Sequence, residues 1–273
     1  REKKDPTGMI KEVDFLRLSS SLYREQTPSM NLTEDEFRNV VSGASSRFEL
    51  WEQIIKDLNA EVVAEIGVWK GAFAKHMLKR CETIRRYYMI DPWANLPDWN
   101  KPFNVSPTAF NDVYAEAMQV TEFAAEKRTV LRGVSREVID RILDESLDAG
   151  YIDGDHTLRG ITIDLIKVLP KIKEGGLLGG DDFKTEPWQE DPRYEPTLVC
   201  PFSVYFAEAM NLPIVALPFN QFVIQKRNDS AFSFIDLTGQ YQNLSLCRHS
   251  SLFNLFPIKR KAKRVLSKIG LKR

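Results

Sequence analysis

From Glu61 to Asp182, short apolar runs alternate with segments that have the length and periodicity of helices. The runs are EVVAEIG, RYYMID, TVLRG, AGYID and GGLLGGDD. Strands that alternate with helices form βαβ units, in which the strands pair in parallel and the crossovers are right-handed. The alternation therefore predicts an α/β fold built on a doubly wound, mostly parallel sheet.

The sheet is expected to end in a hairpin, because two further apolar runs, 212–218 and 221–227, are joined by a very short connection. A parallel crossover needs roughly a dozen residues, so one of these strands must run antiparallel. Before the sheet, residues 46–58 space their apolar side chains at helical intervals and predict a helix with one buried face. We divide the chain into an N-terminal helical extension (1–45), a central domain (46–228) and a C-terminal extension with a basic tail (229–273).

The composition is that of an ordinary globular chain, with 43% hydrophobic and 28% charged residues and a net charge of zero. The chain as a whole therefore has no bias toward nucleic acid. The three cysteines, Cys81, Cys200 and Cys247, form neither a disulfide framework nor a zinc pattern, which favours a reducing, cytoplasmic location. No apolar run approaches the ~20 residues that are needed to cross a bilayer.

In a parallel sheet of this kind, ligands bind outside the carboxyl ends of the strands. In the first turn after a strand, Glu65 precedes Gly67 and Gly71. An acid here suits a ligand with a cationic amino group, and the G-x-G-x-x-G spacing that seats a pyrophosphate is absent. Asp91 ends the second strand, where a carboxylate can accept hydrogen bonds from ribose hydroxyls. These features alone fit either NAD or S-adenosylmethionine.

Three carboxylates, Asp153, Asp181 and Asp182, are expected to meet where the fourth and fifth strands end. Clustered carboxylates repel one another unless a cation neutralises them or one of them stays protonated. An all-oxygen cluster suits a hard divalent ion, and Mg²⁺ is the expected one. Because neighbours on a strand point to opposite sides, Asp182 joins the cluster only if the chain bends after Gly180.

The motifs AEIGVWKGAFA, YMIDPW, LRGVS, YIDGDH and GGLLGGDDF have the order and spacing of class I S-adenosylmethionine-dependent methyltransferases, which the chain resembles over about residues 46–227. It is most similar to the small-molecule O-methyltransferases of the catechol, caffeoyl-CoA and macrolide-sugar types. The resemblance implies a Rossmann-like sheet of seven strands, mostly parallel, with a C-terminal antiparallel hairpin. It also implies S-adenosylmethionine and a divalent metal as cofactors.

The resemblance implies a role for individual residues along these motifs. Cofactor-binding positions are Glu65, Gly67 and Gly71 at the methionine end, Asp91 at the ribose, Gly133 and Ser135 at the adenine, and Trp69, Trp93 and Asp153 nearby. Metal-dependent members carry an acid after strand four, a pair after strand five, and a Lys or His three residues beyond the first acid. These positions correspond to Asp153, Asp181, Asp182 and His156.

His156 is the candidate catalytic base, because a histidine with a pKa near ~6.5 can take a proton at neutral pH. We expect metal-assisted methyl transfer to a hydroxyl of a small molecule: a sugar, a glycoside natural product or a phenol. The alternatives are a nicotinamide-dependent oxidoreductase and a non-catalytic cofactor-binding protein. For single residues, Asp155 could cap the next helix instead, and His156 could be a satisfied structural histidine.

Two loops, 92–107 and 183–196, are long enough to cover such a site and carry the aromatic residues Trp93, Trp99, Phe103, Trp188 and Tyr194. Neither loop has a basic cluster, which disfavours a nucleic-acid substrate. The tail 257–273 has eight basic residues and no acid. It predicts an amphipathic helix that contacts an anionic membrane surface weakly, or a partner, with a solvated or disordered tail as the alternative. The chain could also form a homo-oligomer.

Overall fold

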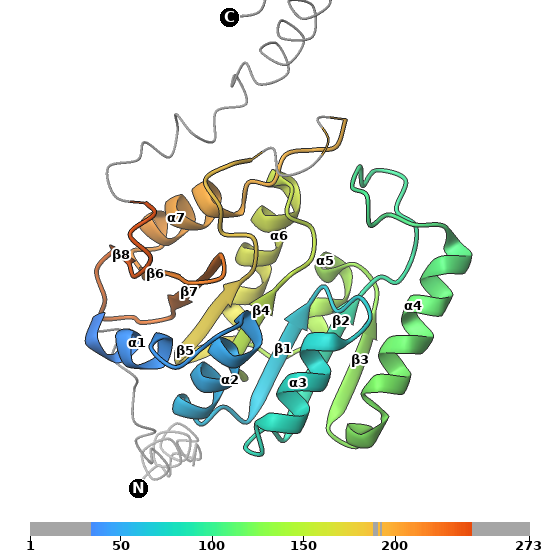
Figure 1. Cartoon of the computed structure of the whole chain (residues 1–273), viewed down its shortest axis with the longest axis horizontal. Coiled ribbons are helices and arrows are strands. Elements are labelled where there is room, and N and C mark those ends of the chain that lie inside the picture. Colours follow the sequence, from blue (N-terminus) through green and yellow to red (C-terminus); the bar gives the residue numbers. More distant parts are fainter. Residues whose placement is uncertain (1–33, 188–190, 192, 242–273) are drawn as a thin grey trace, which may run out of the picture. The chain divides into compact units, whose positions relative to one another are not determined.

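The computed structural model describes residues 34–187, 191 and 193–241 (Figure 1). The basic tail 257–273, residues 1–33, Trp188 and Cys247 lie outside these ranges, and what the sequence predicts for them stays a prediction. Within the described ranges, none of the helices combines the length and the apolar character that a membrane span requires.

Eight strands of the described chain form one sheet, in the order β3-β2-β1-β4-β5-β7-β6-β8 (Figure 1). They are β1 (Val62–Ile66), β2 (Arg86–Asp91), β3 (Arg128–Arg132), β4 (Leu147–Ile152), β5 (Ile172–Gly180), β6 (Pro213–Leu217), β7 (Gln221–Gln225) and β8 (Ser233–Asp236). The strands β1 to β5 pair in parallel, and β7 runs antiparallel to β5 and to β6. The α/β class and the hairpin are thus confirmed. The prediction of seven strands is wrong by one, because β8 adds to β6 in parallel and is too short to show a periodicity.

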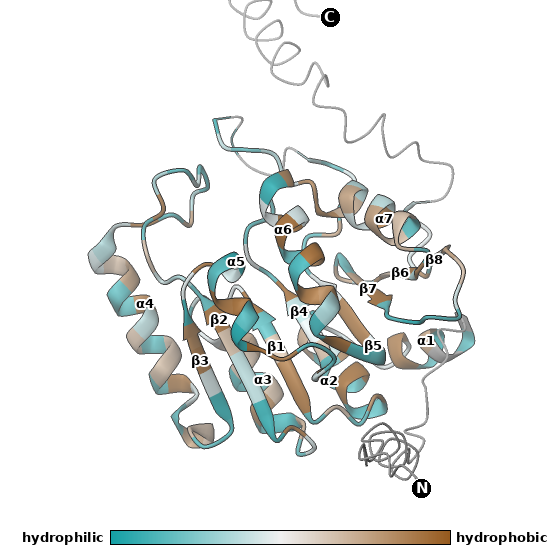
Figure 2. Ribbon diagram, turned by 180° about the vertical axis from the view of Figure 1, so that it is seen from behind, coloured by the Kyte–Doolittle hydropathy of each residue, from teal (hydrophilic) through white to brown (hydrophobic). Residues whose placement is uncertain are grey.

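Helices cover both faces of the sheet (Figures 1 and 2). They are α1 (Glu34–Val41), α2 (Arg47–Asp57), α3 (Ala72–Arg80), α4 (Pro107–Val120), α5 (Ser135–Val138), α6 (Leu158–Val168) and α7 (Val199–Ala209). Helix α3 contacts α2 and α4, whereas α6 contacts α5 and α7. Successive residues of β4 show the two faces. Tyr151 stacks on Phe73 of α3 with ring centroids 3.9 Å apart, and Ile152 belongs to the core that includes α6 and α7.

Helix α2 is fixed to the sheet by its buried face. Ser46 caps its start by accepting a hydrogen bond from the backbone N–H of Glu49. Trp51 is buried, lies edge-on to Tyr151 with centroids 4.9 Å apart, and donates from Nε1 to Gln221 Oε1 at 2.9 Å. Gln221 begins β7 next to the end of β5, since Phe222 pairs with Gly180. These contacts hold the first turn of α2 near the carboxyl ends of β4 and β5.

The strand order changes direction between β1 and β4, which is where open α/β sheets bind their ligands. The two strands end very close together. The backbone N–H of Asp153 donates to the carbonyl of Ile66 at 2.7 Å. Gly67 has a φ of 89°, and a Cβ at this position would lie 2.1 Å from the carbonyl oxygen of Asp153. Only glycine fits here, because both the backbone conformation and the space exclude a side chain.

We expect Gly67→Ala to lower the free energy of unfolding by clearly more than ~1 kcal/mol, because alanine is strained at a positive φ and also meets the backbone of Asp153. Gly43→Ala is the matched control, since a Cβ at Gly43 meets no atom within 4 Å. Urea unfolding of both variants measures the effect. Equal stability of the two would show that the close approach of β1 and β4 is not a constraint.

Candidate active site

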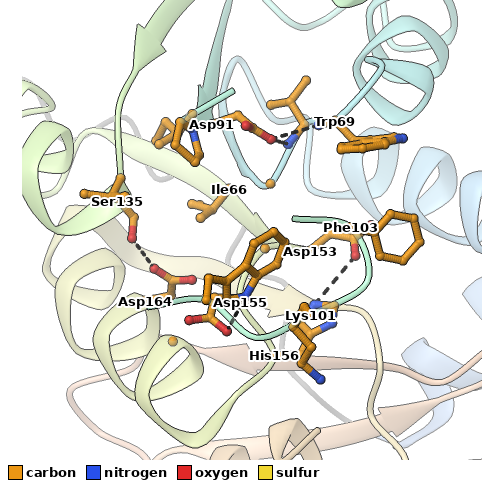
Figure 3. Close-up of a pocket in the computed structure, with 18 of the residues that line it drawn as sticks. Ile66, Trp69, Asp91, Lys101, Phe103, Ser135, Asp153, Asp155, His156 and Asp164 are labelled. Carbon is orange, nitrogen blue, oxygen red and sulfur yellow. Dashed lines mark hydrogen bonds and ion pairs between the residues drawn. The ribbon is translucent and has the colours of Figure 1, made fainter. Parts of the chain in front are cut away.

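A cavity of about 600 Å³ opens at the carboxyl ends of β1, β2, β4 and β5 (Figure 3). Most of the predicted site residues line it: Glu65, Gly67, Trp69, Asp91, Gly133, Ser135, Asp153, His156, Asp181 and Asp182. Gly71 and Trp93 do not. Figure 3 shows Ser135 with Asp164 at one end of the cavity and His156 with Lys101 at the other.

Asp91 fastens the turn between β1 and α3. Its Oδ2 accepts hydrogen bonds from the backbone N–H groups of Val68 and Trp69, both at 2.9 Å. Its Oδ1 accepts from the N–H of Trp93 at 2.7 Å. Burial raises the pKa of Asp91, against the effect of these hydrogen bonds. Since Oδ2 already accepts two hydrogen bonds, Oδ1 is the atom with capacity left for a ligand hydroxyl.

Glu65 points into the cavity wall from β1 and is almost fully buried. It accepts a hydrogen bond from Tyr87 Oη at 2.8 Å through Oε2. Burial raises the pKa of Glu65 well above its usual range, and the charges of Asp153 and Asp91 add to the effect. A cationic amino group in the cavity would offset this penalty, as the sequence predicts for the acid at this position.

The two predicted residues outside the cavity support it from behind. Gly71 caps α3 with a φ of 76°, and a Cβ there would meet Ala117 of α4 at 3.2 Å. Trp93 is buried, lies at 5.1 Å from the ring of Tyr114, and donates from Nε1 to the carbonyl of Trp69 at 2.8 Å. Both residues thus have a structural role, in helix packing and in holding the glycine turn, and their contact with a cofactor stays a prediction.

At the opposite end, Ser135 donates a hydrogen bond to Asp164 of α6. Asp164 is buried, and its burial raises its pKa to about 7 despite the hydrogen bond from Ser135. This carboxylate is not among the site residues that the sequence predicts. Its signal was present, because Asp164 lies three residues from Ile161 and one from Leu165 on the apolar face of the predicted helix.

His156 lies at the other end, between two carboxylates. Its Nδ1 is 2.8 Å from Asp182 Oδ2 and its Nε2 is 3.6 Å from Asp153 Oδ1. Nε2 is buried and has no hydrogen-bond partner among the described residues. Burial lowers the pKa of His156, but the hydrogen bond and charge of Asp182 outweigh it, so that the pKa is raised. Burial acts to raise the pKa of Asp182. The hydrogen bonds and charges of His156 and Lys184 outweigh this effect and hold the pKa of Asp182 well below the usual range.

Asp155 has a structural role, although it is not the cap of the next helix that the sequence left open as an alternative. Its Oδ1 accepts hydrogen bonds from the backbone N–H of Thr157 at 3.0 Å and from Trp99 Nε1 at 3.1 Å. The cap of α6 itself is Thr157, whose Oγ1 accepts from the N–H of Gly160. Asp155 thus shapes the turn before α6 and ties it to the aromatic loop that follows β2. Trp99 and Phe103 of this loop line the cavity, as predicted for a cover.

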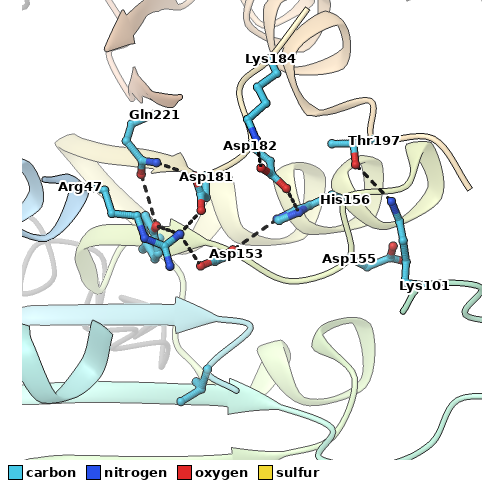
Figure 4. A network of polar contacts seen from close by, with 12 residues as sticks. Arg47, Lys101, Asp153, Asp155, His156, Asp181, Asp182, Lys184, Thr197 and Gln221 are labelled. Atoms are coloured by element: carbon cyan, nitrogen blue, oxygen red, sulfur yellow. Dashed lines mark hydrogen bonds and ion pairs between the residues drawn. The ribbon is translucent and has the colours of Figure 1, made fainter. Parts of the chain in front are cut away.

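Asp153 and Asp181 do come together, but around a side chain of the protein (Figure 4). Arg47 Nη1 donates to Asp153 Oδ2 at 3.0 Å and forms an ion pair with Asp181 Oδ2. Asp181 Oδ1 accepts from Gln221 Nε2 at 2.6 Å. Asp182 has a φ of 58° and turns toward His156 and Lys184.

The residues predicted to bind a divalent metal therefore do not fit one in this arrangement. Two of the three carboxylates already share a guanidinium, and the third faces away from them. In the part of the chain that the structure describes, no three side chains of His, Cys, Asp or Glu are grouped to hold a metal ion. Asp153, Asp181 and Asp182 are thus not arranged as expected for a metal site, and metal binding by these residues stays a prediction. The chain does bend after Gly180, but the bend points Asp182 toward His156 and not toward Asp181.

Residues 64–183 match a protein-family model described as a methyltransferase domain. The segment runs from β1 to just beyond β5 and contains the cofactor turn, Asp91 and the YIDGDH stretch. The match indicates an S-adenosylmethionine-dependent methyltransferase domain in this part of the chain. Of the two cofactors that the glycine turn left open, the match selects S-adenosylmethionine, and the methyltransferase domain replaces the nicotinamide-dependent alternative.

Among solved structures, the methyltransferase domain is similar to a putative caffeoyl-CoA O-methyltransferase from Staphylococcus aureus, with 14% identity, a TM-score of 0.49, and coverage of 77% of this chain and 96% of that one. It is also similar to the S-adenosylhomocysteine-bound methyltransferase PaMTH1 of Podospora anserina, with 14% identity, a TM-score of 0.47, and coverage of 80% and 97%. No curated protein matches the chain. The assignment rests on the family match.

The raised pKa of Asp164 has a consequence for stability. From about pH 4 to about pH 7 the folded protein keeps a proton that the unfolded chain releases, so stability falls as the pH rises through this window. We expect Asp164→Asn, which cannot ionise, to be of the order of 3 kcal/mol more stable than the wild type at pH 8 and equal to it at pH 4. Urea unfolding without cofactor at both pH values checks this.

Asp112→Asn, an exposed carboxylate of α4, is the control. It should leave the difference between the two pH values unchanged. If Asp164→Asn and the wild type respond equally to pH, Asp164 has an ordinary pKa in the folded protein.

Proposed function

We propose that the protein transfers the methyl group of S-adenosylmethionine to a hydroxyl oxygen of a small molecule, with His156 as the base. The observation that carries the proposal is the state of the imidazole. His156 lines the cavity, Nδ1 of its ring is held by Asp182, and Nε2 is buried 3.6 Å from Asp153 Oδ1 without a hydrogen-bond partner in the described chain. A base needs this combination of a fixed ring and a free nitrogen.

The cofactor is proposed to lie between Glu65 and the Ser135–Asp164 pair. Glu65 would meet the amino group of the methionine moiety, and Asp91 Oδ1 would accept a ribose hydroxyl. Ser135 and Asp164 would face the adenine, where a buried carboxyl group can accept a hydrogen bond from an exocyclic amine. This placement leaves the region of His156, Lys101 and Trp99 for the acceptor.

In the reaction, the acceptor oxygen forms a bond to the methyl carbon while the bond from that carbon to the sulfonium sulfur breaks. The hydroxyl proton passes to Nε2 of His156, and the products are the methyl ether and neutral S-adenosylhomocysteine. Asp182 stabilises the imidazolium that results, through its hydrogen bond to Nδ1. Alignment of the two reactants in one cavity supplies a further part of the acceleration.

The aromatic side chains that line the cavity favour a sugar, a glycoside or a phenol as the acceptor. Trp69 packs edge-on against Phe103 and Phe110, with centroids 5.5 and 5.9 Å away, and all three line the cavity. Flat aromatic faces suit the apolar faces of sugars and phenols. Lys101 is nearly buried and donates to Thr197 Oγ1 at 3.1 Å, so the same wall also holds polar groups.

An acceptor screen tests the reaction class. Sugars, glycosides and phenols are offered with S-adenosylmethionine that is isotopically labelled in its methyl group, next to a matched panel of amines. We expect labelled methyl ethers and an equal amount of S-adenosylhomocysteine. Label transfer to amines alone would contradict the proposal of a hydroxyl acceptor and leave the methyltransferase assignment intact.

We expect His156→Gln to lower kcat by about 10²–10⁴-fold with S-adenosylhomocysteine binding unchanged, because glutamine can hydrogen-bond to Asp182 but cannot take the proton. The wild-type rate should rise with pH through a pKa above the usual value for histidine, and the variant should lose this dependence. His76→Gln is the control, because His76 pairs with Glu52 outside the cavity. A pH profile that is the same in His156→Gln and the wild type would assign the base elsewhere.

A further inference from the structure

We infer that Arg47 supplies the positive charge that a divalent ion would supply at the acceptor end, so that this methyltransferase works without a metal and holds the acceptor oxygen with a guanidinium. The part of the inference that concerns the acceptor rests on the proposed function. The part that concerns the metal rests on the contacts of Arg47 alone.

The first argument is the position of the guanidinium. Arg47 Nη1 lies between Asp153 and Asp181, at the point where those two carboxylates converge (Figure 4). A cation bound by both carboxylates would have to occupy the same place. Helix α2 holds Arg47 there, since Trp51, one turn further on, is buried and bonded to Gln221.

The second argument is the balance of charge. Three carboxylates, of Asp153, Asp181 and Asp182, face Arg47, Lys184 and His156. Lys101 lies near enough to act on the pKa of His156. Arg47 and Lys184 therefore already offset two of the three negative charges of the cluster. A divalent ion bound at the same place would be repelled by both of these side chains.

The third argument is the capacity that remains on the guanidinium. Its contacts with Tyr151, Asp153 and Asp181 all involve Nη1. Nε and Nη2 form no hydrogen bond with any residue in the described ranges, although the side chain lines the cavity and is 32% exposed. An arginine has N–H donors on all three nitrogens. The donors on Nε and Nη2 can bind an oxygen of the acceptor, and their positive charge favours its deprotonation.

The test uses the full chain and Mn²⁺ as the probe, with binding read from the loss of the free-ion signal in electron paramagnetic resonance. We expect no Mn²⁺ site in the wild type and unchanged methyl transfer after treatment with EDTA. We expect Arg47→Met to gain a Mn²⁺ site, because Asp153 and Asp181 are then left without a cation. Adding Asp181→Asn to Arg47→Met should remove that site, and Arg47→Lys, which keeps the charge, should not create it.

A wild-type Mn²⁺ site that Asp181→Asn abolishes would overturn the inference. So would an Arg47→Met variant that binds S-adenosylhomocysteine, and is therefore folded, but gains no Mn²⁺ site. In the acceptor part, Arg47→Met should lower kcat/KM about 100-fold, the usual cost of a lost charged donor at a reacting oxygen, and an unchanged kcat/KM would overturn that part. If no hydroxyl is methylated by the wild type, the proposed function fails, whereas the Mn²⁺ results still decide the role of Arg47.

Discussion

The parallel pairing of β4 with β5 imposes the constraint on which the rest of the site depends. The register sets Ile152 opposite Gly180, so the next residues, Asp153 and Asp181, leave the sheet side by side. Two carboxylates on adjacent strand ends repel each other, so one of them is driven to keep its proton unless a cation lies between them. Burial makes the demand stronger, and it raises the pKa of Asp153 despite the cations nearby. The cation is the guanidinium of Arg47, which belongs to α2, the helix just before the first strand of the sheet.

Much of this fold could be predicted from the sequence, because its signals are local. The short apolar runs that end in Gly or Asp predict the parallel strands and the edge of the sheet at which their carboxyl ends meet. Asp153, Asp181 and His156 lie at that edge for the same reason. Gly67 and Asp91 could be predicted as cavity residues because the glycine turn and the end of a strand are both recognised from a few consecutive residues.

What the sequence analysis missed depends on distant contacts or on single backbone angles. Arg47 is 106 residues from Asp153 in the chain, and nothing local connects them. A weak sign existed, since a basic residue in the first turn of a helix opposes the helix dipole by ~0.3–1 kcal/mol. Asp182 points away from Asp181 because its own backbone is left-handed. The hydrophobic periodicity of a sequence does not reveal a single backbone angle. The resemblance implies that Trp93 lies near the cofactor, whereas in the structure its indole Nε1 donates to the backbone carbonyl of Trp69.

The segment that matches the methyltransferase family, 64–183, holds the cofactor turn and the histidine, whereas Arg47 and Gln221 come from before and after it. The counter-ion of Asp153 and Asp181, and the amide that hydrogen-bonds to Asp181, therefore come from outside the segment that matches the family. A chain that began at β1 would lack Arg47 and leave two adjacent carboxylates to take a counter-ion from solution.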